Sequence, residues 1–488
     1  MEGKKITHVI CPYCCHKFKP NSAEFRLPSA LAPPPPDPNE PKKRGRKKKY
    51  TGLAQDEKLF AYFTKILGES EKTAEAKALK FQAVSPDDPR AEGRESDLER
   101  FGFYSEIIFA EEPLNPDCPT LESSERLCPN CHNILPVGFG LRDTVLISII
   151  GDARAGKSVY LTMLIEELEN NRDFPSKLSF IGDESTRALI YDNYQKPLLE
   201  DRILIDSTKR RRIPPFSYNF WYKYRDAAGE LRENNIDIIF YDIAGEDMRD
   251  DSSIRKNGFN IRDSSGLIFL LDPTNFRSLK DVFMLRDRDI IDAIPVENSI
   301  QRVFSAMFNY FIGMDTDKSP IPLALTLSKV DLFKFAELDF FTNRPESRMQ
   351  AELDGEGFDG FIDLRINRGM NLEVKELLLH LNEGSVIHNA YGCFRHMSCF
   401  AVSSLGRKPI TEKISDPETN ETVERGYVDG EPEPFRVKDP FYWILLKNDL
   451  LYCGESGEYR RVDEKPAVKA YESPFERLVG FLRGILRF

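Results

Sequence analysis

Long hydrophobic runs are missing from this chain of 488 residues. No uninterrupted apolar stretch approaches the roughly 20 residues that a membrane-spanning helix needs. The N-terminal residues 1–5 lack the apolar stretch of a signal peptide. Positive charge is not in excess either, since the formal net charge is -11, which removes any overall attraction to nucleic acid. With 41% hydrophobic residues, we expect a soluble, cytoplasmic protein of two or three domains.

Cysteine usage argues against a disulfide scaffold. Four of the nine cysteines form two C-x-x-C pairs, Cys11 with Cys14 and Cys128 with Cys131, each with proline after its first cysteine. The two-residue gap brings both sulfurs of a pair to one side of a tight turn, and two such turns make a tetrahedral Zn²⁺ site. The sequence therefore predicts a structural zinc bound by these four residues.

The two pairs define a zinc ribbon over residues 1–140, split by a partly ordered insertion at about 17–124. Such an insertion is tolerated because the entropy of loop closure grows slowly with length. Three further residues adjoin the pairs: Cys15, His16 and His132. We expect them to lie near the metal without binding it; the alternative is that one of them replaces a cysteine as a ligand.

The insertion contains a proline run and then a basic octet at residues 42–49. The octet offers contacts to DNA phosphates, and its Arg44-Gly-Arg46 core is similar to a minor-groove hook without the usual following proline. A solvated basic loop is the favoured alternative. Further on, periodic apolar residues predict a helix over residues 56–80, and residues 101–109 are expected to form a strand.

A buried strand and a phosphate-binding loop organise the middle of the chain. Residues 144–150 are continuously apolar and rich in β-branched side chains, which is typical of a strand covered on both faces. The next eight residues fit the pattern G-x-x-x-x-G-K-[ST]. Its glycines let backbone N–H groups point at phosphate oxygens, its lysine neutralises the β- and γ-phosphates, and its serine offers a hydroxyl to Mg²⁺. The pattern predicts a nucleoside triphosphate site made of Gly151, Asp152, Ala153, Arg154, Ala155, Gly156, Lys157, Ser158 and Val159.

A D-x-x-G pattern ends the second apolar strand after this loop. Residues 216–224 and 236–242 are expected to form a hairpin that ends at Asp242, whose carboxylate then reaches Mg²⁺, usually through water. Gly245 brings its N–H close to the γ-phosphate. The following residue, Glu246, adds negative charge where a Gln or His often orients water. We therefore predict slow intrinsic hydrolysis that a partner accelerates.

The threonine that senses Mg²⁺ in the first switch has no clear motif. Thr208 is the best-placed candidate, and Thr186 is a weaker one. An arginine within residues 209–212, or Arg154 in the phosphate loop, is an outside candidate for contact with the γ-phosphate; a solvated basic loop is preferred for 209–212.

Two later strands end in residues that suit guanine. Asp331 follows the apolar residues 321–327, and its carboxylate can accept both the N1–H and the exocyclic amine of guanine, a pair of donors that adenine does not offer. The stem of Lys329 can lie along the purine face. Ser328 keeps a hydroxyl but lacks the reach of an amide, which predicts weaker nucleotide affinity. A last strand leads to a small-residue loop that is expected to support guanine through backbone N–H groups: Ser403, Ser404 and Leu405.

In this order, the motifs resemble those of a TRAFAC-class P-loop GTPase. The D-I-A-G-E form, the N-terminal ribbon and residues 439–446 are similar to the bacterial double-GTPase family, second type. The resemblance implies an α/β, Ras-like fold: a mostly parallel sheet with helices on both faces and one antiparallel hairpin strand. It places a GTPase domain at residues 141–460, with insertions at about 276–320 and 334–397. It also implies GTP or GDP with Mg²⁺ as ligands, and a second GTPase or another conflict-system effector as the partner.

The C-terminal residues 461–488 are expected to form an amphipathic helix. Residues 474–488 carry one apolar face, which suits a membrane surface, a groove on a partner or packing on the protein's own domain.

Three functions remain as hypotheses. The first is a slow or partner-activated GTPase that acts as a nucleotide-dependent switch or assembly factor, with a bacterial conflict or defence system as its setting. The second is a non-hydrolysing scaffold bound to GTP or GDP, and the third is a zinc-ribbon adaptor for nucleic acid. Glu246 favours the second over a fast enzyme, whereas Lys157, Ser158 and Asp242 favour the first.

Overall fold

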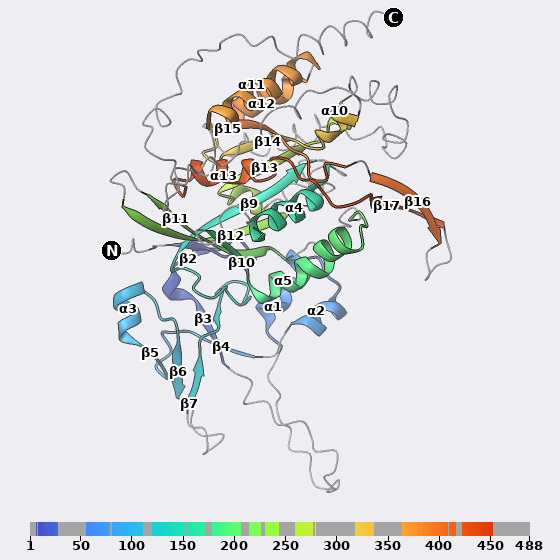
Figure 1. Ribbon diagram of the computed structural model, residues 1–488. Helices are drawn as coiled ribbons and strands as arrows, with labels where there is room; N and C mark the ends of the chain where they lie inside the picture. The colour runs from blue at the N-terminus through green and yellow to red at the C-terminus, as the bar shows by residue number, and fades with distance from the viewer. Residues whose placement is uncertain are drawn as a thin grey trace, which may run out of the picture. The chain divides into compact units, whose positions relative to one another are not determined.

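In the computed structural model, the chain folds into two compact units (Figure 1). The first contains residues 1–144 with 211–215, and the second contains residues 145–210 with 216–488. The structure describes residues 6, 8–27, 55–78, 81–110, 120–151, 155–170, 178–205, 214–225, 230–243, 259–276, 279, 318–335, 364–381, 383–407, 409–415 and 422–451.

The first unit is built from short antiparallel strands and short helices. Its strands form one hairpin and two three-stranded sheets: β1 (Val9–Ile10) with β2 (Lys17–Phe18); β4 (Gln82–Val84), β3 (Glu24–Leu27) and β8 (Arg126–Leu127); β5 (Ala91–Gly93), β6 (Ile107–Ala110) and β7 (Thr120–Ser123). Its helical segments are η1 (Pro20–Ser22), α1 (Glu57–Ala61), the π-helical η3 (Tyr62–Ile66), α2 (Glu71–Lys77) and α3 (Glu95–Phe101). Tyr62 and Leu67 share one buried core with Cys11, Cys128 and Cys131.

The helix predicted over residues 56–80 begins where expected but is interrupted. Asp56 caps α1 by accepting a hydrogen bond from the N–H of Leu59 at 2.7 Å. The helix then ends before Gly68, which has a φ of 68°. Ser70 starts α2 as a new N-cap, accepting from the N–H of Thr73. The single long helix was therefore wrong, because a left-handed residue and a second cap divide it.

The strand predicted over residues 101–109 is only half correct. Phe101 is the last residue of α3, and Gly102 ends that helix with a φ of 80°, a conformation that glycine adopts readily. The strand β6 begins later, at Ile107.

A seven-stranded sheet forms the core of the second unit. Its order is β10 (Leu178–Gly182), β11 (Phe216–Arg225), β12 (Leu231–Asp242), β9 (Asp143–Gly151), β13 (Gly266–Leu271), β14 (Leu323–Leu327) and β15 (Met397–Ala401). Strands β9, β13, β14 and β15 are parallel, and β11 is antiparallel to both of its neighbours. Every residue of β13 and β14 is buried, as expected when both faces of a sheet are covered. The predicted fold class is confirmed, but the edge strand β10 was not predicted.

Helices pack on this sheet along its length (Figure 1). The helix α4 (Lys157–Glu169) contacts β10 and β12, and α13 (Asp439–Lys447) contacts β13 and β14. A Cβ on Gly266 would lie 2.3 Å from the side chain of Ile444, so glycine permits the close approach of α13. The remaining helical segments are α5 (Glu184–Ile190), the π-helical η4 (Tyr191–Glu200), α7 (Phe259–Arg262), η6 (Pro273–Asn275), α10 (Asp331–Phe335), α11 (Leu364–His380) and α12 (Gly384–Cys393).

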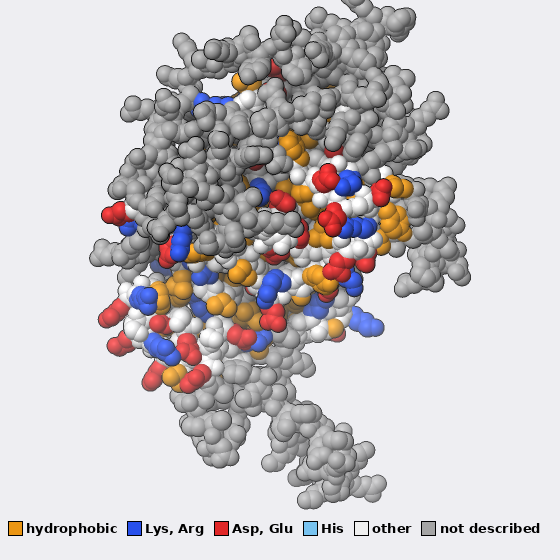
Figure 2. Space-filling view, in the orientation of Figure 1, with side chains coloured by type: hydrophobic (Ala, Val, Ile, Leu, Met, Phe, Trp, Pro, Cys, Tyr) orange, Lys and Arg blue, Asp and Glu red, His pale blue; other side chains and the backbone are white. Residues whose placement is uncertain are grey.

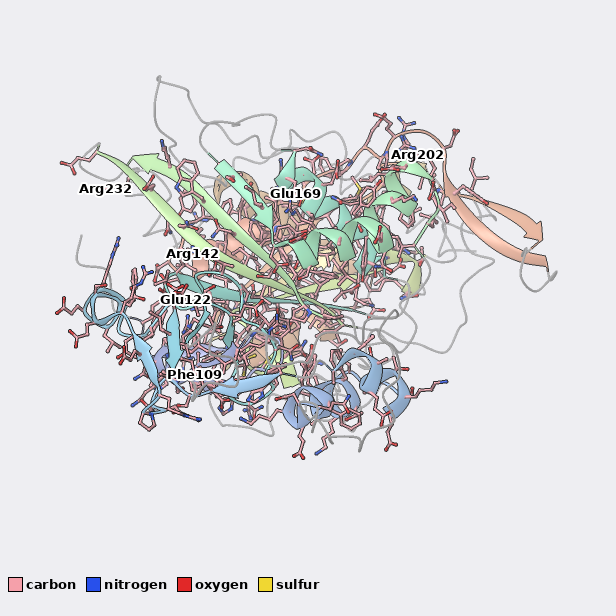
Figure 3. All side chains as sticks on the ribbon, turned by 90° about the horizontal axis from the view of Figure 1, so that it is seen from below. Phe109, Glu122, Arg142, Glu169, Arg202 and Arg232 are labelled. Carbon is pink, nitrogen blue, oxygen red and sulfur yellow. The ribbon has the colours of Figure 1, made fainter. Side chains whose placement is uncertain are left out.

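A hairpin of β16 (Pro409–Ser415) and β17 (Thr422–Val428) extends away from the sheet in Figure 1. The chain that follows η4 pairs with it: the N–H of Val428 donates to the carbonyl of Arg202, and the N–H of Leu204 donates to that of Gly426. Figure 3 shows Arg202 near the start of the hairpin. Residues 202–205, which directly precede the segment containing Thr208, are thus held against β17.

Within the described residues, no helix has the length and apolarity that crossing a membrane requires. Residues 461–488, including the predicted amphipathic helix, lie outside the described part of the chain. The same holds for the basic octet 42–49, most of the segment 276–320, and residues 336–363 of the segment 334–397.

Candidate functional site

The phosphate loop starts where β9 runs close against β13. Gly151 has a φ of 151°, and a Cβ there would lie 2.6 Å from the carbonyl oxygen of Leu270, so glycine alone fits. At the other end, Gly156 has a φ of 82° and precedes the first residue of α4. Lys157 is 6% exposed and donates from Nζ to the carbonyl of Gly151 at 3.1 Å. A buried ammonium and a helix N-terminus thus meet at one loop, which suits a phosphate group.

The two predicted Mg²⁺ residues lie together. The hydroxyl of Ser158 donates to Asp242 Oδ2 at 2.7 Å. The second oxygen, Asp242 Oδ1, is buried and has no hydrogen-bond partner among the described residues. Burial raises the pKa of Asp242, against the opposing effects of Lys157 and Ser158. An unpartnered buried carboxylate oxygen beside a hydroxyl fits a hard cation such as Mg²⁺.

Tyr194 is a residue of this site that the sequence did not indicate. It lies on η4 and is buried, and its hydroxyl has no hydrogen-bond partner among the described residues. Burial and the negative charge of Asp242 together raise the pKa of Tyr194, so the phenol stays neutral. A single tyrosine in a largely polar stretch carries no motif, which is why the pattern of residues could not find it.

Six of the predicted site residues cannot be placed. The phosphate-loop residues Asp152, Ala153 and Arg154 lie outside the described residues, as does Thr208. The same holds for the pair Gly245 and Glu246, so the roles assigned to all of them remain predictions.

The two loops predicted to bind the base come together. Asp331 Oδ1 accepts a hydrogen bond from the hydroxyl of Ser403 at 2.7 Å, and that hydroxyl accepts the N–H of Gly406 at 2.9 Å. Burial raises the pKa of Asp331, while the bond from Ser403 and the charge of Lys329 act in the opposite direction. Ser404 and Leu405 follow in the same loop. The Asp331 carboxylate is thus oriented before any ligand arrives.

Ser328 joins this region to the phosphate loop. Its hydroxyl lies 3.1 Å from the carbonyl oxygen of Ala155 and 3.0 Å from that of Leu271. The short side chain bonds both carbonyls, and its shorter reach relative to an amide stays a prediction. Weaker nucleotide affinity remains a prediction.

The four predicted zinc ligands converge in the first unit. Their sulfurs all lie within 4.8 Å of one another, with Cys11 and Cys131 3.7 Å apart and Cys14 and Cys128 3.7 Å apart. A tetrahedron with Zn–S bonds of about 2.3 Å has edges of about 3.8 Å. The arrangement therefore fits zinc.

The two knuckles repeat the same backbone geometry. Cys15 donates its N–H to the carbonyl of Cys11 at 3.0 Å, and His132 donates to that of Cys128 at 2.9 Å. Both Cys15 and His132 have a φ of 54°. Backbone N–H groups also point at the first sulfur of each pair, at 3.4 Å in both knuckles.

His132 lies next to the four-sulfur cluster in the sequence and packs in the same region. Its Nδ1 lies 2.6 Å from Asp56 Oδ2, and its Nε2 lies 2.9 Å from Glu24 Oε2. Burial opposes protonation, but hydrogen bonds to Glu24 and Asp56 outweigh it and raise the pKa of His132. With a carboxylate facing each ring nitrogen, the side chain ties α1 and β3 to the second knuckle.

The fold is that of a P-loop GTPase, as the motifs indicated. Residues 145–368 match the family model described as Double-GTPase 2. This part of the chain is therefore similar to the Double-GTPase 2 family, and the predicted resemblance is confirmed there.

Two proteins are similar to this chain. It is 24% identical over 357 residues to "Putative ESX-1 scaffolding and assembly protein SaeC" of Mycolicibacterium smegmatis, a match covering 67% of this chain and 83% of that protein. It is also similar to the solved GTPase-like domain of S. cerevisiae Ski7, bound to GTP, with 12% identity and a TM-score of 0.27. That match covers 63% of this chain and 50% of the Ski7 chain.

Acid should weaken guanine binding at a higher pH than an ordinary aspartate would allow. The ionised form of Asp331 is needed to accept two donors, and its pKa is raised above the usual value of about 3.9. Affinity is then full at neutral pH and falls as the pH drops through the raised pKa. The affinity for GDP, measured between pH 4.5 and 8 without added Mg²⁺ so that Asp242 and the ion do not contribute, gives the midpoint.

Ser403→Ala is the matched variant for this titration. It removes the bond that lowers the pKa of Asp331, so the midpoint should move to higher pH. The ligand is the same in both proteins, so titration of its phosphates does not contribute to this difference. An identical midpoint in both proteins would show that Asp331 does not govern the profile.

Proposed function

We propose that this GTP-binding protein is a slow GTPase whose nucleotide state controls its assembly with a protein partner. The observation that carries the proposal is the meeting of Asp331 with Ser403 beside the phosphate loop. The carboxylate suits the N1–H and amine of guanine, and the nearby Lys157 and Ser158 suit its phosphates.

Hydrolysis of GTP needs mainly positioning and charge neutralisation, because its loose transition state asks for little covalent chemistry. In this proposal Lys157 and the N-terminus of α4 hold the phosphates, and Ser158 and Asp242 hold Mg²⁺. When bound, the ion supplies positive charge that offsets the negative charge developing on the phosphoryl oxygens. Glu246 adds a further negative charge after the D-x-x-G glycine, which supports slow turnover in the absence of a partner.

A protein partner is supported by the relative from Mycolicibacterium smegmatis, whose name describes scaffolding and assembly. A nucleotide-dependent assembly factor fits both this similarity and the predicted slow hydrolysis. The Double-GTPase 2 match makes a second GTPase, within a bacterial conflict or defence system, the first partner to test.

The non-hydrolysing scaffold is the second candidate, and Glu246 is the residue that favours it. Phosphate release from GTP, compared with ATP, with and without a partner, separates the two: the scaffold releases none in either case. An adaptor for nucleic acid is less favoured, since Figure 2 shows Lys and Arg interspersed with Asp and Glu over the described part of the face in view.

Asp331→Asn is expected to exchange GTP for XTP as the preferred ligand. The amide offers one acceptor and one donor. It therefore loses the charged hydrogen bond to the exocyclic amine of guanine, and its NH2 can instead donate a hydrogen bond to the 2-oxo group of xanthine. Each hydrogen bond to a charged group contributes about 1.5–3 kcal/mol, so GTP affinity should fall about 10- to 100-fold while XTP affinity rises. Competition of both nucleotides against a fluorescent GDP analogue measures the exchange.

The exposed residue Asp429 provides the control for this exchange. Asp429→Asn makes the same chemical change away from the base site and should leave the GTP preference intact. An Asp331→Asn protein that still prefers GTP over XTP would overturn the assignment of the base.

A further inference from the structure

Asp272 is a buried carboxylate that none of the sequence motifs includes. It follows β13, is 2% exposed, and its Oδ1 accepts hydrogen bonds from the N–H of Thr274 at 2.9 Å and from the hydroxyl of Thr274 at 2.7 Å. The turn η6 thus fixes this carboxylate in one position. Its other oxygen, Oδ2, lies 2.6 Å from Lys329 Nζ. The carboxylate of Asp272 is therefore held in place on one side and forms an ion pair with Lys329 on the other.

Lys329 is held at both ends of its side chain. Its backbone has a φ of 52°, a conformation uncommon for a residue with a side chain, and this turns the side chain towards the phosphate loop. Its Cε lies 3.8 Å from the position that a Cβ on Gly156 would occupy. The methylene stem thus lies beside the loop, with the ammonium tied to Asp272.

We propose that Asp272 is a positioning residue that holds the Lys329 stem as a preformed wall for the purine ring. The inference rests on the proposed function, since it assigns a task within the same nucleotide site. A free lysine side chain loses much rotamer freedom when it becomes ordered on binding. Because the ion pair orders it beforehand, that loss is removed from the cost of binding.

This task differs from that of Asp331. The stem offers methylene groups to the ring face, which guanine and hypoxanthine share, whereas Asp331 meets the edge of the base. Losing the Asp272 charge should therefore weaken GDP and IDP by the same factor and leave their ratio unchanged. Immobilising one long side chain on binding corresponds to about 3- to 10-fold in affinity.

Asp272→Asn is the direct test, because it keeps the size of the side chain and an acceptor for the Thr274 N–H but removes the charge. Dissociation rates of fluorescent GDP and IDP should both rise about 3- to 10-fold. In a Lys329→Met background, which keeps an apolar stem without an ammonium, the same Asp272→Asn change should alter the rates less than about 2-fold. A role limited to capping η6 predicts equal effects in both backgrounds, and that result would overturn the proposal.

Lys329→Met alone keeps the test decisive if Asp272→Asn does not fold. It should reproduce the faster release, and a wild-type rate would overturn the proposal. Lys329→Arg, which can still pair with Asp272, should restore most of the lost affinity. The two inferences fail separately: a wild-type protein that shows no preference for guanine over adenine nucleotides contradicts the proposed function, whereas guanine binding with additive effects contradicts the task of Asp272 only.

Discussion

The Lys157→Ala variant should bind GTP about 100- to 1,000-fold more weakly than the wild-type protein. Removing one member of a buried, hydrogen-bonded charge pair costs about 2–5 kcal/mol, and Lys157 is buried with its ammonium at the phosphate loop. Its charge also lowers the pKa of Asp242, so the Mg²⁺ site loses a supporting charge as well. Titration calorimetry with GDP and with a non-hydrolysable GTP analogue, in Mg²⁺, measures the loss.

An exposed lysine of the same unit gives the matched control. Lys196→Ala removes a positive charge from η4, where the side chain is exposed, and should change GTP affinity less than about 2-fold, because solvent screens exposed charges. Thermal unfolding of both variants establishes that the fold is retained. Unchanged GTP binding by a folded Lys157→Ala protein would mean that the triphosphate site lies elsewhere.

Removal of the metal should unfold the first unit. The predicted zinc ligands Cys11, Cys128 and Cys131 belong to the same buried core as Tyr62 and Leu67, so losing the metal should open the core as well as the knuckles. Binding of a structural zinc contributes about 10–16 kcal/mol in small zinc domains, more than a unit of this size can lose. Cys11→Ser, or treatment with a strong chelator, should therefore make the described residues up to 144 sensitive to protease.

Elemental analysis provides the companion measurement, with one zinc per chain expected in the wild-type protein and less in Cys11→Ser. Cys393, a buried cysteine of the second unit that lies outside the four-sulfur group, supplies the control: Cys393→Ser should keep its zinc. A metal-free wild-type protein with an intact first unit would contradict the zinc assignment.

Local sequence patterns predicted several parts of this structure. The phosphate loop between β9 and α4, the two cysteine knuckles and the start of a helix at residue 56 depend on residues close in sequence, so spacing and side-chain type suffice to predict them. The continuously apolar residues 144–150 of β9 predicted a strand covered on both faces for the same reason. The break within residues 56–80 was missed, although Gly68 and Ser70 are the local signals that mark it.

Contacts between distant residues were set by the order and register of the strands. Ser158 meets Asp242, and Asp331 meets Ser403, across 84 and 72 residues of chain. Motif order had suggested these pairs, but their bonds exist because parallel strands end at one edge of the sheet. Nothing in the sequence pointed to Tyr194 or Asp272, since each is an ordinary residue until packing buries it against a charged partner. Long-range packing therefore determined which charged and polar side chains of the site contact one another.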